Sequence, residues 1–289
     1  MNENIRAALM IVVGMAMIST NDVILKLSRA DYGVGQILLV RGMMAVALFA
    51  LLIRIRKKRL FVPRMFRGPS LGRAVCECLA TFCFVFSLGI LPIATVTTLA
   101  WAAPIFLTVA SVLFLGERVA IVRWTAVVAG FAGVLMVTNP WAEEFRWEML
   151  LPLVTAIFIA ARDLLTKSIH ESVDSANVVL VTLIVVTIGG AVLAVFYWQS
   201  ISIWHTAQLL LSAALLSFGF YLNIRGVRTG ELSFVAPFFF FSIPVSIFWG
   251  YVVWGDTLPA IAVAGILLII ASGLVILLRQ GRRGRDLPD

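Results

Sequence analysis

The sequence contains few charged residues. Asp, Glu, Lys and Arg together make up 13% of the 289 residues, whereas about a quarter of the residues of a typical soluble domain are charged. This shortage excludes an ordinary globular domain. Hydrophobic residues make up 61% of the chain and the mean hydropathy is +1.03, so we expect an all-α integral membrane protein.

Residues that commonly carry catalytic chemistry are also scarce. The chain has two histidines and three cysteines, and Cys76, Cys78 and Cys83 all fall in one predicted helix. Cys76 and Cys78 are two positions apart and point to different faces, so neither a disulfide nor a closed metal site is expected. The sequence has no H-E-x-x-H motif and no G-x-x-x-x-G-K-[ST] loop. We therefore expect no enzyme, no metal, no cofactor and no nucleotide-driven motor.

Ten apolar runs of roughly 18 to 23 residues follow one another along the chain. A helix rises about 1.5 Å per residue, so each run can cross about 30 Å of hydrocarbon. No small-x-small cleavage site follows the first run, so we expect it to remain as a helix. The predicted spans lie near residues 6–27, 36–53, 72–91, 94–115, 120–138, 148–168, 176–198, 207–226, 231–254 and 259–278.

The basic residues are distributed unevenly between the predicted loops. The connection from Arg54 to Arg73 holds eight of the 23 lysines and arginines, whereas the loops of the opposite side hold only Arg29 and Arg146. The positive-inside rule therefore places this connection and both termini in the cytoplasm. Because the net charge of +8 is accounted for by orientation in the lipid membrane, no nucleic-acid partner is expected.

One distinctive segment recurs about 140 residues later in the chain. It runs from Ile93 to Glu117 and again from Ser233 to Asp256, and each copy closes on a glycine followed by an acid. Each copy also has an aromatic residue three positions before a proline, namely Trp101 before Pro104 and Phe241 before Pro244. This pattern is typical of a chain built from two copies of one unit.

A second correspondence links the first and sixth predicted helices. Asp22 with Lys26 is matched by Asp163 with Lys167, each an acid four residues before a lysine. We therefore predict two five-helix repeats, residues 1–140 and residues 141–289 with a short basic tail. An odd number of spans per repeat inverts the second copy, an arrangement that suits alternating access.

Both predicted repeats end in a similar way. Leu-Gly-Glu at 115–117 and Trp-Gly-Asp at 254–256 each precede a final helix that contains glycines. With the segments 21–42 and 88–92, these residues make the chain resemble the drug/metabolite transporter superfamily, and within it the EamA-type bacterial carriers of ten helices. The resemblance implies a multi-pass protein of the bacterial inner membrane, whose central cavity is lined by both halves and carries a small organic metabolite.

Five residues are candidates for lining that cavity: Trp101, Pro104, Phe241, Pro244 and Asn223. Matching prolines inside two spans remove backbone hydrogen bonds and indicate hinges or cavity walls, although prolines are also tolerated wherever neighbours satisfy the freed groups. Trp101 lies deep in the predicted bilayer, away from the interfacial belt in which tryptophan is enriched. Its indole N–H therefore needs a partner, which a substrate would supply.

Seven charged residues are predicted inside or at the ends of spans, where charge is costly: Asp22, Lys26, Arg41, Glu77, Arg162, Asp163 and Lys167. We expect Asp22 to pair with Arg41, Glu77 with Arg73, and Asp163 with Lys167, which leaves Arg162 without an obvious partner. Such pairs either orient helices and close a gate, or serve proton coupling and recognition of a charged substrate. The sequence leaves both alternatives open.

Two predictions remain for the transported substrate. The resemblance includes amino-acid exporters and the central helices are rich in aromatic residues, which favours export of amino acids, including aromatic ones. The alternative is uptake of a flat, cofactor-like metabolite such as S-adenosylmethionine or riboflavin. Driving force would come from a gradient. Two complete halves make a monomer sufficient, and a dimer is compatible with the sequence.

Overall fold

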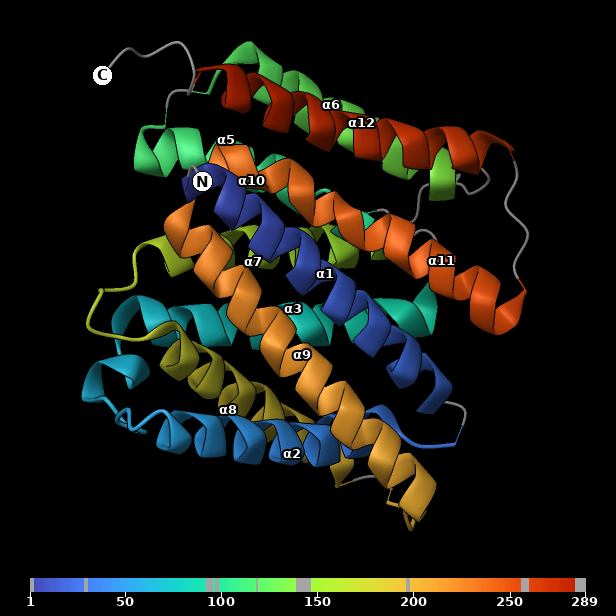
Figure 1. Ribbon diagram of the computed structural model, residues 1–289. Helices are drawn as coiled ribbons and strands as arrows, with labels where there is room; N and C mark the ends of the chain where they lie inside the picture. The colour runs from blue at the N-terminus through green and yellow to red at the C-terminus, as the bar shows by residue number, and fades with distance from the viewer. Residues whose placement is uncertain are drawn as a thin grey trace.

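The computed structural model describes residues 3–28, 31–91, 96, 99–117, 119–138, 147–195, 198–255 and 260–283. Every regular element within these ranges is a helix, and the long helices run side by side across the molecule (Figure 1). Asp256 and the loop residues Arg29 and Arg146 lie outside the described residues.

The elements follow one another with these bounds: α1 Glu3–Ser28, α2 Val34–Ile55, η1 Pro63–Phe66, α3 Gly68–Ile90, α5 Ala103–Leu115, α6 Ile121–Thr138, η3 Trp147–Met149, α7 Leu150–Lys167, α8 Ser175–Ala194, α9 Ile203–Thr229, α10 Leu232–Val235, η4 Ala236–Phe241, α11 Ser242–Trp254 and α12 Ala260–Arg283.

The apolar content of the helices agrees with a membrane protein. Among the described residues, six helical segments are long and apolar enough to cross a bilayer, and three shorter helices are also apolar. Each predicted run overlaps a helix of the structure, while the count of ten spans stays a prediction. The start of α1 and the end of α12 lie at the same end of the bundle (Figure 1). Which side of the membrane this end faces also stays a prediction.

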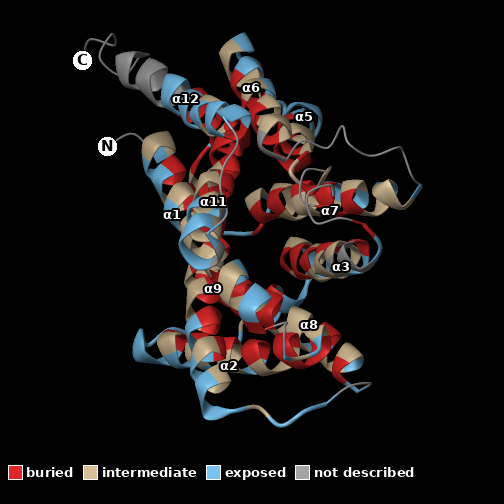
Figure 2. Cartoon of the chain, turned by 90° about the vertical axis from the view of Figure 1, so that its right-hand side faces the viewer, coloured by how far each residue is buried: buried red, intermediate tan, exposed pale blue. Residues whose placement is uncertain are grey.

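The main packing partners are distant in sequence. α1 packs along α9, α3 along α7, α2 along α8, and α6 along α12. In the view of Figure 2, α3 and α7 lie on the opposite side of the molecule from α1 and α9, with α2 and α8 below and α6 and α12 above. Each of these four pairs joins one helix from the first half of the chain to one from the second half.

Glycines allow two of these pairs to approach closely. A Cβ atom added to Gly14 on α1 would lie 2.9 Å from the carbonyl oxygen of Gly219 on α9. One added to Gly133 on α6 would lie 2.7 Å from the carbonyl oxygen of Gly265 on α12. Small residues let membrane helices pack backbone to backbone, where van der Waals contact drives association.

Two of the predicted continuous spans are interrupted in the structure. The span predicted at 94–115 contains α5, which begins only at Ala103, after a turn at Trp101 and Ala102. The span predicted at 231–254 is divided into α10, the 3-10 helix η4 and α11. Proline explains where α5 and α11 begin, because it has no backbone N–H and fits best in the first turn of a helix. Pro104 is the second residue of α5 and Pro244 is the third residue of α11.

The two interrupted spans end alike. α5 and α11 are each 13 residues long. They stop at Gly116, with φ of 65°, and at Gly255, with φ of 70°. A left-handed glycine after the last turn satisfies carbonyl groups that the helix leaves free. The glycines of the two Gly-acid pairs are therefore helix terminators.

Candidate functional site

A polar cluster joins three helices near the end of α1. Asn21 on α1 accepts hydrogen bonds at its Oδ1 atom from Arg41 Nη1 on α2, at 3.0 Å, and from Ser212 Oγ on α9, at 2.6 Å. Its Nδ2 atom donates to Asp22 Oδ1 at 2.9 Å. We call Asn21, Asp22, Arg41 and Ser212 the Asn21 cluster. All of its members except Asp22 are buried.

The predicted ion pair between Asp22 and Arg41 is wrong for this conformation. No contact within 4.0 Å joins their charged atoms, and Asn21 connects the two side chains instead. Arg41 is only 6% exposed and its Nε atom has no hydrogen-bond partner. A buried guanidinium with a free donor is costly, so Arg41 retains capacity to bind a further acceptor.

Asp22 lies on a face of α1 that is buried nearer the start of the helix. Ala8, Ile11 and Met15 lie on this face and are buried in a hydrophobic cluster. Asp22 is seven residues after Met15 and therefore continues the same face, yet it is exposed. The protein thus covers this face over the first part of α1 and leaves the Asp22 side chain uncovered near its end.

Two hydrogen bonds join the same turn of α1 to α11. Trp249 Nε1 donates to Thr20 Oγ1 at 3.0 Å, and Ser19 Oγ donates to the carbonyl oxygen of Ser242 at 3.1 Å. Thr20 and Asp22 are two positions apart and lie on different faces of α1. The contact with Trp249 is therefore made on a different face from the one that carries the Asp22 carboxylate.

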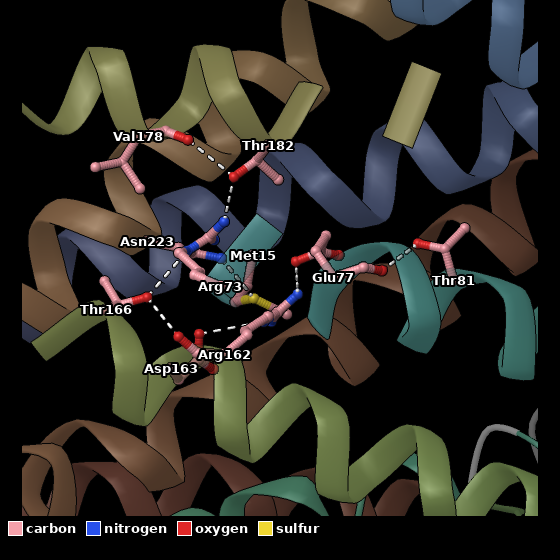
Figure 3. A network of polar contacts seen from close by, with 10 residues as sticks. All are labelled: Met15, Arg73, Glu77, Thr81, Arg162, Asp163, Thr166, Val178, Thr182 and Asn223. Carbon is pink, nitrogen blue, oxygen red and sulfur yellow. Dashed lines mark hydrogen bonds and ion pairs between the residues drawn. The ribbon is translucent and has the colours of Figure 1, made fainter. Parts of the chain in front are cut away.

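A second polar cluster lies between α3, α7 and α8 (Figure 3). Arg162 on α7 forms ion pairs with Glu77 on α3, at 2.5 Å, and with Asp163, at 3.2 Å. The side chains of Glu77 and Arg162 are 8% and 14% exposed. Burial strengthens such contacts and makes loss of one partner expensive. We call these three residues, with Arg73, Thr166 and Thr182, the Arg162 cluster.

Arg73 connects this cluster to α8. It donates from Nε to Thr166 Oγ1 at 2.9 Å and from Nη1 to Thr182 Oγ1 at 2.6 Å. Both threonines donate in turn to carbonyl oxygens one helical turn earlier, those of Arg162 and Val178. The predicted local pair between Arg73 and Glu77 is therefore not formed, because each residue finds its partner across a helix interface.

The predicted pair between Asp163 and Lys167 is also wrong, as is the expectation that Arg162 has no partner. Arg162 is long enough to reach back to Asp163 while contacting α3. Lys167 instead donates to the carbonyl oxygens of Arg228, at 3.5 Å, and Gly230, at 2.5 Å. A lysine at this position neutralises free carbonyl groups at the end of α9.

The predicted cavity residues differ in their surroundings. Trp101 is half-buried in the turn before α5, and its indole N–H has no hydrogen-bond partner among the described residues. Phe241 lies against Gly273 of α12. Asn223 is buried on α9, where Nδ2 donates to Met15 Sδ at 3.1 Å and Oδ1 has no partner.

The remaining candidates differ in burial. Pro104 is buried and Pro244 is half-buried. Lys26 is exposed near the end of α1. The candidates chosen from the sequence did not include Asn21, Ser212, Trp249 or Thr182. Asn21 could have been chosen because it adjoins Asp22, whereas a serine or threonine in an apolar run carries no such signal.

Glu117, which follows α5, links the first half of the chain to the start of α10 in the second half. Its Oε1 and Oε2 atoms accept hydrogen bonds from the backbone N–H groups of Leu232 and Ser233, each at 3.0 Å. These are the first donors of α10, which have no partner within the helix. A carboxylate at a helix N-terminus is also favoured by the helix dipole.

Replacing Glu117 by alanine should lower the free energy of unfolding by about 1–3 kcal/mol, because two buried donors lose a charged acceptor. Thermal unfolding in detergent micelles measures this loss. Glu231→Gln is the matched control, since Glu231 is 50% exposed and pairs with Arg123; surface pairs contribute only about 0–1 kcal/mol. Equal effects of the two variants would contradict the capping role.

Long apolar helices packed around buried charged clusters are typical of a membrane protein whose intramembrane charges have a functional role. Within the described residues no group of three or more His, Cys, Asp or Glu residues could hold a metal ion. The chain belongs to the EamA-like transporter family, whose model matches residues 5–139. It is a multi-pass protein of the bacterial inner membrane.

Three relatives are named as transporters of small molecules. The chain is 30% identical over 218 residues to a riboflavin transporter of Rhizobium johnstonii, covering 74% of this chain and 72% of the relative. It is 24% identical over 194 residues to an S-adenosylmethionine uptake transporter of Rickettsia bellii, covering 67% of each. It is 23% identical over 276 residues to a pseudopaline exporter of Pseudomonas aeruginosa, covering 93% of this chain and 94% of the relative.

A solved crystal structure has the same overall fold. The superposition gives a TM-score of 0.81 and covers 94% of this chain and 97% of the other, at 14% sequence identity.

Proposed function

We propose that the protein is a secondary carrier that works by alternating access, with residues 1–140 and 141–289 as inverted repeats. The helix packing supports this. When α1 is exchanged for α7, α3 for α9 and α5 for α11, the contact of α1 with α9 becomes that of α7 with α3. The contact of α1 with α11 likewise becomes that of α7 with α5. Such an exchange is expected of two copies related by a twofold axis.

The two polar clusters occupy corresponding positions. Arg162 and Asp163 lie 141 positions after Asn21 and Asp22, and Thr182 lies 141 positions after Arg41. The Arg162 cluster is closed by ion pairs. In the Asn21 cluster, by contrast, Asp22 is exposed and a donor of Arg41 is free. We assign this conformation to the state that is open at the Asn21 cluster, and the opposite state to one in which the clusters exchange roles.

For the substrate we propose uptake of a flat heteroaromatic metabolite of the riboflavin or S-adenosylmethionine class. The observation that carries this is the exposed Asp22 on an otherwise buried face of α1, together with the free Nε donor of Arg41. Carboxylate and guanidinium groups can bind the polar edge of a planar ring system. The names of two relatives support the same class.

Export of amino acids is the second candidate. The direction, export, is supported by the pseudopaline exporter of Pseudomonas aeruginosa, which matches 93% of this chain. A free Arg41 donor and an adjacent Asp22 carboxylate also suit the two charges of an amino acid.

Counterflow in proteoliposomes tests the proposal. Vesicles are preloaded with unlabelled riboflavin, S-adenosylmethionine or an amino-acid mixture, and the labelled compound is added outside at several pH values. We expect accumulation with one of the two cofactor-like compounds. Accumulation with amino acids alone would favour the second candidate, and no exchange with any of them, from folded protein, would contradict both.

A further inference from the structure

Two arginines from different helices converge on one tyrosine near the end of α2. Arg56 directly follows α2, and Tyr221 and Arg225 lie one turn apart on α9. The Nη1 atom of Arg56 is 3.4 Å from the Tyr221 hydroxyl oxygen, and the Nη1 atom of Arg225 is 3.5 Å from it. The Cζ atom of each arginine is also 5.7 Å from the centre of the tyrosine ring. Two guanidinium groups are therefore held close together.

These two positive charges have no negative partner in the part of the chain that the structure describes. Neither Arg56 nor Arg225 forms an ion pair there. The connection from Arg54 to Arg73 contains eight basic residues and no acid. A tyrosine ring attracts a cation but does not neutralise it, and like charges repel one another. The two arginines therefore favour an anion from outside the chain.

The same three side chains have hydrogen-bond donors to spare. Both contacts with the Tyr221 hydroxyl are longer than the usual range of about 2.7–3.2 Å, so they engage the guanidinium groups only weakly. Among the described residues, the two arginine side chains make no other hydrogen bond, and the Tyr221 O–H donates to no acceptor. Arg56 is exposed, whereas Tyr221 and Arg225 are half-buried. Three donor groups are thus available at the surface to one anionic acceptor.

Aromatic packing fixes the position of the tyrosine. Phe49 on α2 is fully buried. The centre of its ring lies 6.2 Å from that of Tyr221 and 5.6 Å from that of Phe218 on α9. Such contacts between aromatic rings stabilise the packing of α2 on α9. Because the tyrosine is already held in place, binding of a ligand would require little ordering of the protein.

An apolar strip leads away from the arginines along α9. Phe218 and Leu211 lie seven and fourteen residues before Arg225 and therefore share its face of the helix. Phe218 is half-buried and Leu211 is 55% exposed. Ile55, the last residue of α2, is 69% exposed. Positive charge beside exposed apolar side chains suits a molecule with an anionic head and a hydrocarbon tail.

We propose that Arg56, Tyr221 and Arg225 form a binding site for the phosphate group of an anionic phospholipid, whose acyl chain lies along Phe218 and Leu211. The guanidinium groups bind phosphate oxygens through charge-assisted hydrogen bonds, and the tyrosine hydroxyl donates a third bond. Phosphatidylcholine fits less well, because its choline group would add a third positive charge. The site is separate from both polar clusters and does not depend on the transported substrate.

A lipid bound here would join the two halves of the chain. Arg56 belongs to the first half, Tyr221 and Arg225 belong to the second, and α2 packs against α9. A phosphate between the arginines would offset their repulsion and hold the end of α2 against α9. Anionic lipid should therefore raise the melting temperature, because it binds the folded protein and not the unfolded chain.

The test uses the full chain in neutral detergent. Retention of phosphatidylglycerol, with phosphatidylcholine for comparison, is measured by native mass spectrometry, and thermal unfolding is followed with each lipid. Phosphatidylglycerol should be retained more strongly and should raise the melting temperature more. Arg56→Gln and Arg225→Gln should each weaken its retention about tenfold, and Tyr221→Phe about three- to tenfold. Tyr221→Phe keeps the ring that packs on Phe49, so it tests the hydroxyl in a folded protein even where an arginine variant unfolds.

Arg54→Gln is the matched control, because it removes the same charge from the last turn of α2 without removing a contact to Tyr221. It should change retention by less than about twofold. Equal losses in Arg54→Gln and Arg225→Gln, or equal retention of the two lipids, would overturn the proposal. So would binding of radiolabelled inorganic phosphate in equilibrium dialysis that Arg225→Gln weakens, since the site would then belong to a soluble anion.

Discussion

Replacing Arg162 by alanine should destabilise the protein by about 3–5 kcal/mol, the usual cost of leaving a buried charge without its partner. Glu77 and Asp163 both lose their ion pair in this variant. At about 2–4 °C per kcal/mol, the melting temperature should fall by roughly 6–20 °C. Thermal unfolding in detergent micelles measures the shift.

The companion variant removes all four charges of the cluster together, because the buried Arg73 would otherwise keep a charge without an acid nearby. In the quadruple variant Arg73→Met, Glu77→Gln, Arg162→Met and Asp163→Asn, no unpaired charge remains in the cluster, so most of the lost stability should return. Transport should nevertheless stay impaired, because the ion pairs that close this end of the bundle are gone. If the quadruple variant is as unstable as Arg162→Ala, the penalty does not come from unpaired charge and the interpretation fails.

Replacing Asp22 by asparagine should reduce transport about 30- to 150-fold with almost no loss of stability. The carboxylate is exposed, and its one hydrogen bond among the described residues comes from Asn21. Folding therefore depends little on its charge. A charge-assisted hydrogen bond from the Asp22 carboxylate to the substrate is worth about 2–3 kcal/mol. Each 1.4 kcal/mol changes a binding constant about tenfold.

Initial counterflow rates, normalised to the amount of folded protein, give the effect of Asp22→Asn. Asp31→Asn is the control, since Asp31 is a second exposed acid following α1 and pairs with His205 at the surface. It should transport within about twofold of the unmodified protein. An unaltered rate in Asp22→Asn would show that the accessible carboxylate contacts neither substrate nor coupling ion.

The sequence predicted the helical class and the positions of the helices, because an apolar run and its length can be read from the local sequence without knowing the fold. It also located the two distinctive segments, since prolines and Gly-acid pairs mark helix breaks directly. The division of the second segment into η4 and α11 was not predictable from proline spacing. It depends on tertiary partners as well, such as the Ser19 hydroxyl that bonds the carbonyl of Ser242.

The partners of the charged residues were the least predictable part of the site. The four-residue spacing of Asp163 and Lys167 suggests a pair along one helix. Asp163 instead pairs with its sequence neighbour Arg162, and Lys167 with a carbonyl group at the end of α9 that only the fold brings near. Asp22 and Arg41 were correctly singled out together, although Asn21 stands between them. Local spacing cannot reveal an arginine that crosses to another helix.

The close contact between α1 and α9 has a consequence for biosynthesis. Gly14 meets Gly219, so the first helix to enter the membrane cannot bury its glycine face until about three quarters of the chain has been made. The stretch that matches the family model, residues 5–139, contains α1 but not this partner. The stretch that the family model recognises therefore does not contain all the packing partners of its own first helix. If translation stopped at its end, α1 would be in the membrane before α9, against which it packs, had been synthesised.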